Sequence, residues 1–161
     1  PQGDAVQSWQ AAGAGMAVLL ATQHPDRFRA IAMHSGIATG VAHCSTSAIK
    51  AMFGKAATPS PLPPIPPDVQ LPALLVIHGT ADRVAAKPGK PRTVQRGTRY
   101  AAAITDYRKD GRPVATHCEI VQLAHAWSGG AASQPFSDAK GPDASLMIWG
   151  FVAREFCRET D

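Results

Sequence analysis

Two segments of the sequence carry a carboxylate and an imidazole that can form a catalytic pair. Asp82 closes the segment His78-Gly79-Thr80-Ala81-Asp82, and His125 opens the segment His125-Ala126-Trp127-Ser128-Gly129-Gly130. In nucleophilic catalysis such a carboxylate fixes the tautomer of the histidine, which activates the nucleophile and later protonates the leaving group. A lone Asp or His at a loop start is more often a turn former or a cap, so the prediction depends on finding both in this order.

Both segments follow runs that are typical of buried strands. Residues 71–79 form an apolar run closed by His-Gly, which is typical of a central parallel strand buried on both faces. Residues 114–123 form the next strand. Ligands bind beyond the C-terminal ends of the strands in parallel sheets. The sequence therefore predicts that Asp82 and His125 lie at consecutive strand ends, on the binding edge of a sheet.

The remaining elements predict an alternation of helices and strands. Strands are expected at Ala5–Ser8 and at 28–33, and a turn at 110–112. We expect a buried helix at 12–23, helices near Thr46–Phe53 and at 93–108, and a final helix that opens at Asp143 and places Met147, Ile148, Phe151, Val152 and Phe156 on one face. This order predicts the α/β class, with a mainly parallel sheet flanked by helices.

The order Asp then His predicts a nucleophile further upstream. In the α/β-hydrolase fold the triad follows the chain order Ser, Asp, His, and the Ser occupies a Gly-x-Ser-x-Gly turn between a strand and a helix. This sequence has Trp9-Gln10-Ala11-Ala12-Gly13 at that place. Ala11 stands where Ser is required, and Trp9 stands where the first Gly belongs. Because an alanine methyl group cannot attack a carbonyl, we expect this chain to catalyse little or no acyl transfer.

Other nucleophilic and metal-binding side chains carry weaker signals. Ser8 lies inside a presumed strand and is interpreted as structural, and Ser35 follows another strand end, where its geometry to His125 would differ from that of a triad. The adjacent pairs His43-Cys44 and His117-Cys118 point in different directions and rarely chelate one ion. We therefore expect no metal and no cofactor.

The composition excludes several classes of protein. The chain has 161 residues, of which 45% are hydrophobic and 17% charged, so it has room for one domain and is unlike a disordered chain. No apolar run reaches the length of a membrane span. The net charge of +4 is scattered, which favours a solvated basic face over a nucleic-acid site.

Cysteine and proline usage leave some alternatives open. Cys44, Cys118 and Cys157 have no Cys-x-x-Cys spacing, so either one disulfide with one free thiol or three buried thiols fits the sequence. Residues 59–67 contain six prolines, which excludes a helix or a central strand there. We interpret 59–70 as an extended surface loop; a stiff linker and a peptide ligand for a proline-binding domain are the alternatives.

Taken in order, these motifs resemble the C-terminal part of the polyhydroxybutyrate-depolymerase-like esterases, a branch of the α/β-hydrolase fold that includes feruloyl and acetylxylan esterases. The matching stretches run almost from end to end: Ala12-Gly13-Ala14-Gly15-Met16-Ala17, residues 24–30, Met33-His34-Ser35-Gly36, residues 78–84, residues 125–130 and Gly141-Pro142-Asp143-Ala144-Ser145. The resemblance implies that Asp82 and His125 are the acid and the base. It also implies that Ala12 supplies an oxyanion-hole N–H and that Trp127 walls the site of an ester or polyester substrate.

The resemblance also shapes our expectations for the whole chain. It implies that residues 1–161 are the C-terminal part of a single α/β-hydrolase domain whose N-terminal strands are missing. A homodimer through the exposed sheet edge is then possible, and the family implies an extracellular or periplasmic location, although no signal peptide is visible. The alternatives are a catalytically silent module that binds an ester, phenolic or polymer ligand, and a truncated or misread frame without native function.

Overall fold

The structure is a computed structural model that describes residues 5–10, 12–36, 69–82 and 92–158, with side chains from residue 13 onward. Its elements are β1 (Ala5–Gln10), α1 (Ala12–Gln23), a 3-10 turn (Pro25–Arg27), β2 (Phe28–His34), β3 (Ala73–Gly79), β4 (Arg92–Val94), β5 (Ala102–Lys109), β6 (Arg112–Ile120), β7 (Trp127–Ser128), β8 (Ser137–Asp138) and α3 (Ala144–Phe156). The helix expected near Thr46–Phe53 and residues 59–68 of the loop expected at 59–70 lie outside the described residues.

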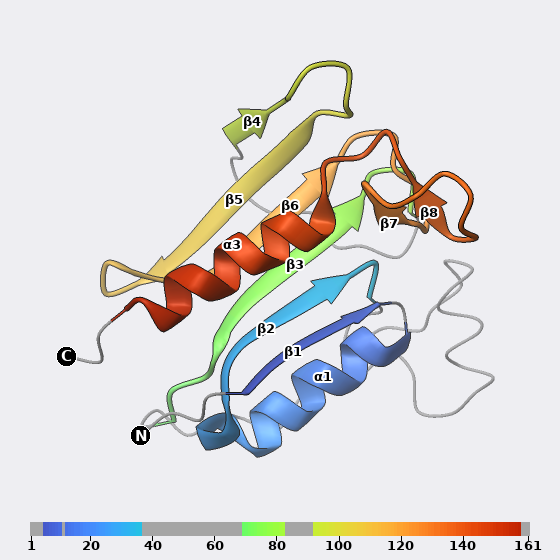
Figure 1. Cartoon of the computed structure of the whole chain (residues 1–161). Helices are drawn as coiled ribbons and strands as arrows, with labels where there is room; N and C mark the ends of the chain where they lie inside the picture. The colour runs from blue at the N-terminus through green and yellow to red at the C-terminus, as the bar shows by residue number, and fades with distance from the viewer. Residues whose placement is uncertain (1–4, 11, 37–68, 83–91, 159–161) are drawn as a thin grey trace.

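Among the described residues, six strands form one sheet in the order β1-β2-β3-β6-β5-β4. The first three pairs in that order are parallel, whereas β5 runs antiparallel to β6 and β4 antiparallel to β5. The sheet is therefore mixed, and the expectation of a mainly parallel sheet is corrected. Figure 1 shows the arrowheads of β1, β2, β3 and β6 at one edge, next to the short β7–β8 pair.

The helix expected at 93–108 is wrong, because this stretch contains β4 and most of β5. The physical reason is the turn that follows. Asp110 and Gly111 have φ values of 52° and 78°, as a two-residue hairpin turn with left-handed central residues requires, and Asp-Gly is among the pairs that favour it. This turn folds β5 back onto β6, so that Ile104 pairs with Cys118 and Thr105 with His117.

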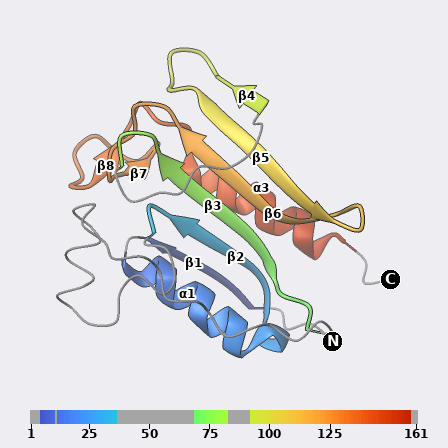
Figure 2. The same cartoon turned by 180° about the vertical axis from the view of Figure 1, so that it is seen from behind.

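Apolar side chains on the two faces of the sheet form two separate cores. On one face Ala30, Ala32, Leu75 and Ile77 pack in a cluster with Phe151 and Val152 of α3. On the other face Ile31 and Met33 pack with Ala14, Ala17 and Ala21 of α1. Figure 1 shows α3 across one face of the sheet, and in Figure 2, seen from behind, α3 lies beyond the strands. The central strands β2 and β3 are thus sandwiched between helices, as their apolar runs predict.

The helix at 12–23 is confirmed, and its buried face is made of small residues. Small residues face the sheet, with Ala14, Ala17 and Ala21 buried. Met16 and Leu19, by contrast, are 56% and 36% exposed. Alanine at every third or fourth position lets the helix axis approach the sheet closely, so the larger side chains point elsewhere.

The final helix begins where the sequence predicts. The side chain of Asp143 accepts a hydrogen bond from the backbone N–H of Leu146 at 3.0 Å, which is N-capping geometry. Phe151 and Val152 are buried as expected, whereas Phe156 is 42% exposed. Within the described residues, no helix is both long and apolar enough to cross a membrane.

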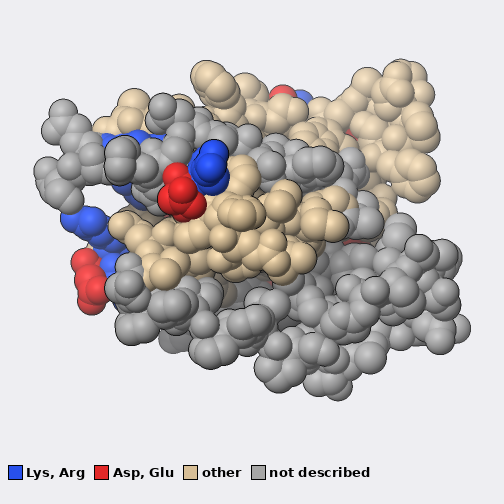
Figure 3. All heavy atoms as spheres, turned by 90° about the horizontal axis from the view of Figure 1, so that it is seen from below, with Lys and Arg blue, Asp and Glu red and all other residues tan. Residues whose placement is uncertain are grey.

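The charged side chains on one end of the molecule are seen in Figure 3. Lysine or arginine and aspartate or glutamate lie near one another on this face, among many uncharged residues. Arg27 lies 3.6 Å from Asp26 in an exposed pair of this kind. Mixed charges are typical of a solvated surface.

Candidate active site

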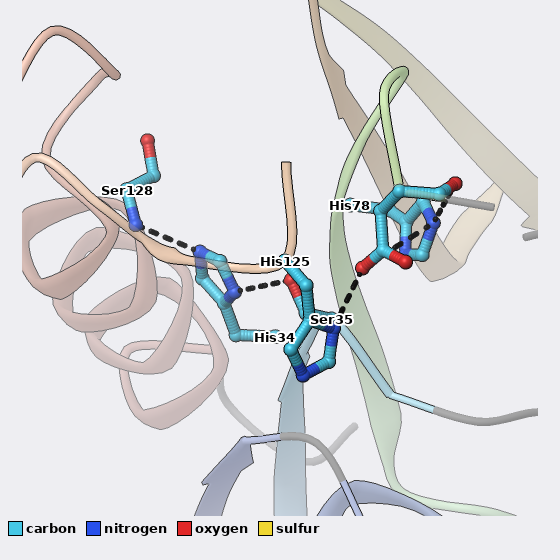
Figure 4. A network of polar contacts seen from close by, with 6 residues as sticks. His34, Ser35, His78, His125 and Ser128 are labelled. Atoms are coloured by element: carbon cyan, nitrogen blue, oxygen red, sulfur yellow. Dashed lines mark hydrogen bonds and ion pairs between the residues drawn. The ribbon is translucent and has the colours of Figure 1, made fainter. Parts of the chain in front are cut away.

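Strand order brings several chain segments to one edge of the sheet. The parallel strands β1, β2, β3 and β6 end there, with Gln10 beside His34 and His34 beside Ile77 in the register. His78 pairs with Glu119 on the next strand. The segments that follow these strand ends therefore meet, although they are far apart in the sequence. Figure 4 shows His34, Ser35, His78, His125 and Ser128 gathered at this edge.

The structure brings Asp82 and His125 into hydrogen-bond contact. Nδ1 of His125 lies 3.0 Å from Oδ2 of Asp82. An ionised carboxylate only accepts hydrogen bonds, so Nδ1 carries the proton and Nε2 keeps its lone pair. The Asp82 side chain is 3% exposed and that of His125 is 29% exposed. His125 can therefore present a basic nitrogen to a reactant while Asp82 holds its orientation, and the catalytic roles of both residues stay predictions.

Backbone contacts hold the two loops that carry this pair. The N–H of Ala81 donates to the carbonyl of Leu123 at 3.1 Å, and that of Gln122 donates to Oγ1 of Thr80 at 2.9 Å. Gly79 makes this approach possible, since a Cβ at this position would overlap the Leu123 carbonyl oxygen and lie 2.6 Å from its carbon. Packing thus requires glycine at the His-Gly end of the strand, where the Asp82 loop contacts the His125 loop.

His34 has a role that the sequence did not reveal. It is fully buried at the end of β2, where its Nε2 accepts the backbone N–H of Ser128 at 3.1 Å. Its Nδ1 lies 3.1 Å from Oγ of Ser35. Because Nε2 accepts, the ring is neutral and Nδ1 donates to Ser35. Burial, followed by the nearby His78 and His125, lowers the pKa of His34 to about 4. His34 and Ser128 are 94 residues apart, so no local sequence pattern predicts this contact.

Ser35 is not placed to act as a nucleophile. It is fully buried and has a left-handed φ of 51°. The only histidine nitrogen within hydrogen-bond distance of its hydroxyl among the described residues is Nδ1 of His34, which already carries a proton. His34 therefore cannot remove the Ser35 proton, in agreement with the low weight that the sequence gives this serine.

His78 is a second imidazole close to Asp82. Its Nε2 lies 3.3 Å from the backbone carbonyl of Asp82 and 4.0 Å from Oδ2. The geometry lets Nε2–H donate to the carbonyl, and both side chains are 3% exposed. His78 thus helps to hold the turn on which the carboxylate sits. The sequence identified this residue only as the end of a strand.

The turn expected to hold the nucleophile lies between two described elements. β1 ends at Gln10 and α1 begins at Ala12, so a single residue separates strand from helix. This is the strand–turn–helix order that the Gly-x-Ser-x-Gly motif requires. Ala11 itself lies outside the described residues. Ala12 is the first residue of α1, where a backbone N–H has no partner inside the helix.

Trp127 follows His125 by two residues and borders a hollow along α3. Its ring stacks on that of His34, with centroids 4.8 Å apart and planes 21° from parallel. It also borders an apolar hollow of about 760 Å³, whose other lining residues come from α3: Ser145, Ile148, Trp149, Val152, Ala153, Phe156 and Cys157. Trp127 therefore offers an apolar surface near His125, as a substrate wall would.

The cysteines correct one expectation. Cys118 and Cys157 are both free thiols; Cys118 is buried and Cys157 is exposed. The alternative of three buried thiols is therefore wrong. Every disulfide among the three cysteines would use one of these two, so the disulfide alternative is not found either. Burial raises the pKa of Cys118 to about 12, which makes it an inert thiol. In the described part of the chain, no three His, Cys, Asp or Glu side chains form a group that could hold a metal ion.

Comparison with protein families identifies the relatives of this fold. The family model described as Esterase PHB depolymerase matches residues 3–112, about two thirds of the chain. The chain belongs to this esterase family. The match spans β1 to β5 and includes Asp82 of the candidate pair, whereas His125 lies beyond it. A search of curated proteins found no match. Membership in the PHB-depolymerase esterase family indicates an esterase-like function.

Proposed function

We propose that this member of the PHB-depolymerase esterase family carries the site of a carboxylic-ester hydrolase, of polyester- or aryl-ester-cleaving type, at the sheet edge that carries Asp82 and His125, with Ala11 at the position of the nucleophile. The observation that carries the proposal is the 3.0 Å contact between these side chains, which follow the ends of the neighbouring parallel strands β3 and β6. The match to the esterase family supports the interpretation of this contact as part of an esterase site. In this proposal the fold is that of an α/β-hydrolase, with Trp127 against the substrate and the N–H of Ala12 in the oxyanion hole.

The reaction associated with such a site is a two-step acyl transfer. A serine hydroxyl attacks the ester carbonyl while the histidine takes its proton, and the protonated histidine then gives this proton to the departing alcohol. Water afterwards releases the acid with the same histidine as base. Ala11 has no hydroxyl for the first step. We therefore expect the chain to hydrolyse esters little or not at all. Nε2 of His125 is still expected to be available as a base.

A second candidate is a binding module that holds such a ligand without cleaving it. The apolar hollow beside Trp127 favours this alternative, because it offers a surface for an apolar ester group. Binding of a hydroxybutyrate oligomer or a ferulate ester without product release is the expected behaviour. Isothermal titration with both ligands tests it, and absence of binding of both ligands contradicts it.

Hydrolysis of a short-chain p-nitrophenyl ester tests the prediction of inactivity. We expect the native chain and His125→Ala to release p-nitrophenol at the same background rate. Asp82→Asn, which keeps the shape of the side chain and removes its charge, serves as a second control. Turnover by the native chain that disappears in His125→Ala shows instead that another nucleophile serves this site.

Reaction with a fluorophosphonate tests whether position 11 faces His125. Such reagents label serines that a neighbouring base activates. We expect no labelling of the native chain at this site, labelling of Ala11→Ser, and loss of that labelling in the double variant Ala11→Ser, His125→Ala. A labelling rate for Ala11→Ser that is independent of His125 contradicts the proposed site.

Location and assembly follow from the family and from β1. The described residues pair β1 with β2 on one side, and unpaired strand edges readily accept another strand. We propose a homodimer through this edge and an extracellular or periplasmic location, as the family suggests. Light scattering checks the dimer, and a monomeric mass at every concentration measured contradicts it.

A further inference from the structure

His34 connects the end of β2 to the loop that carries the candidate base, and the sequence analysis and the proposed pair assign it no role. We propose that His34 is a positioning residue of the site: as a neutral imidazole it holds the backbone of Ser128 and the ring of Trp127, and thereby fixes the loop that presents His125. This inference deepens the proposed function and rests on it for the meaning of His125. The contacts of His34 themselves are independent of any activity.

The loop around His125 is anchored on both sides. On the N-terminal side the carbonyl of Leu123 accepts the N–H of Ala81 at 3.1 Å, which ties the loop to the end of β3. On the C-terminal side the N–H of Ser128 donates to Nε2 of His34 at 3.1 Å, which ties it to the end of β2. His125 lies in the short span between these anchors. Its contact with Asp82 therefore depends on both of them. Ser128 is held by His34 and also by its own hydroxyl, which donates to the carbonyl of Pro142 at 2.6 Å.

The ring of His34 contributes a second contact. It stacks on Trp127, with centroids 4.8 Å apart and planes 21° from parallel. The backbone N–H of Trp127 donates to the carbonyl of Phe136 at 2.7 Å, so this residue is held by its backbone and by its ring. Stacked aromatic pairs add stability beyond the area that they bury. His34 thus fixes two consecutive residues, Trp127 and Ser128.

The neutral state of His34 is a condition for this arrangement. A protonated ring has hydrogens on both nitrogens and cannot accept the N–H of Ser128. The ionisable groups around it among the described residues are His78 at the end of β3, and His125 and Asp82 of the candidate pair; the two histidines disfavour the charge and Asp82 favours it. Burial is the largest cause of the lowered pKa of about 4. The anchor therefore holds at neutral pH and is released in acid.

Two substitutions separate the two contacts of His34. His34→Gln keeps an acceptor, because the amide oxygen of Gln reaches about as far as Nε2, but loses the stacked ring. His34→Phe keeps a ring to stack on Trp127 and loses the acceptor. The first readout is the low-field NMR resonance of the Nδ1 proton that His125 donates to Asp82. It reports the geometry of that pair and needs no turnover.

We expect the His125 proton to exchange with water at least about tenfold faster in His34→Phe, the effect of losing one buried hydrogen bond. His34→Gln should restore slow exchange. If both variants are folded by circular dichroism and exchange this proton at the native rate, His34 does not position His125 and the proposal is wrong. If the resonance is absent from the native chain too, the Asp82–His125 pair fails, and with it the proposed function.

A second measurement on the native chain keeps the proposal testable if His34→Phe does not fold. Protonated imidazole quenches the fluorescence of a stacked indole, so acidification should quench Trp127 with a midpoint near pH 4, following the pKa of His34. Subtracting the fluorescence of the Trp127→Phe variant from that of the native chain isolates the signal of Trp127 from that of the other tryptophans. A difference signal that stays constant through this range overturns the stacked, neutral arrangement.

Discussion

Gly79 is a position where one added methyl group is expected to disturb both the core and the candidate site. A Cβ at Gly79 would overlap the carbonyl oxygen of Leu123 and lie 2.6 Å from its carbon and 2.9 Å from its Cβ. Leu123 is fully buried and its carbonyl accepts the N–H of Ala81. In Gly79→Ala the Leu123 backbone must therefore move away from β3 and weaken this hydrogen bond.

The size of the effect follows from these contacts. Forcing an extra methyl group into a packed core costs about 1–3 kcal/mol, and a weakened hydrogen bond adds about 1 kcal/mol. We expect Gly79→Ala to lower the free energy of unfolding by about 2–4 kcal/mol, which corresponds to a fall in Tm of roughly 5–15 °C for a chain of this size. His125, two residues after Leu123, should at the same time lose its fixed distance to Asp82.

Gly150→Ala is the matched control, because it is the same chemical change in open space. Gly150 lies inside α3, and the nearest atom to an added Cβ is Nη1 of Arg154 at 3.8 Å. Alanine is a better helix former, so we expect this variant to gain about 0.5–1 kcal/mol. Urea unfolding followed by circular dichroism measures both variants. A loss below about 0.5 kcal/mol for Gly79→Ala, typical of unconstrained surface positions, refutes the reasoning from close approach.

Three further predictions concern the same elements. Because the pKa of buried His34 is lowered to about 4, the unfolded chain binds a proton more readily than the folded chain. The free energy of unfolding should therefore fall by up to about 3 kcal/mol as the pH drops from 6.5 to 4. Urea unfolding across this range checks the prediction, and His34→Gln should flatten the pH dependence. Asp143→Ala should cost about 1 kcal/mol of unfolding free energy through loss of the α3 cap, whereas Asp143→Ser should be nearly neutral; equal losses in both contradict the capping role. Leu123→Ala should cost about 2–5 kcal/mol because Leu123 is fully buried, while Leu146→Ala, at a position 68% exposed, should change stability by less than about 0.5 kcal/mol; thermal melts of both distinguish burial from side-chain type.

Local signals predicted those parts of the fold where short-range interactions decide the structure. Asp143 is a good N-cap followed by an apolar face, and α3 begins there. The run at 71–79 is apolar enough to be buried on both faces, and β3 is buried in this way. The apolar spacing at 93–108 predicts a helix, which is wrong because the left-handed Asp110-Gly111 turn favours a hairpin at this place. Pairing with β6 makes this stretch a strand.

The candidate site likewise has features that local sequence predicts and features that depend on distant contacts. By itself the sequence determined which residue types follow each strand, and so it named Asp82, His125 and Trp127, and it showed alanine at position 11. Consecutive parallel strands end at one edge, which is why two residues far apart in sequence could be expected to meet.

The way these residues are held depends on contacts between segments that are distant in the sequence. The acceptor role of His34 depends on the N–H of Ser128, 94 residues away, and the need for glycine at position 79 depends on the backbone of Leu123. The sequence around His34 does not indicate Ser128 as its partner, and the sequence around Gly79 does not indicate Leu123. Hydrogen bonds and van der Waals contacts act over a few ångströms of space, and the fold alone determines which distant segments come that close.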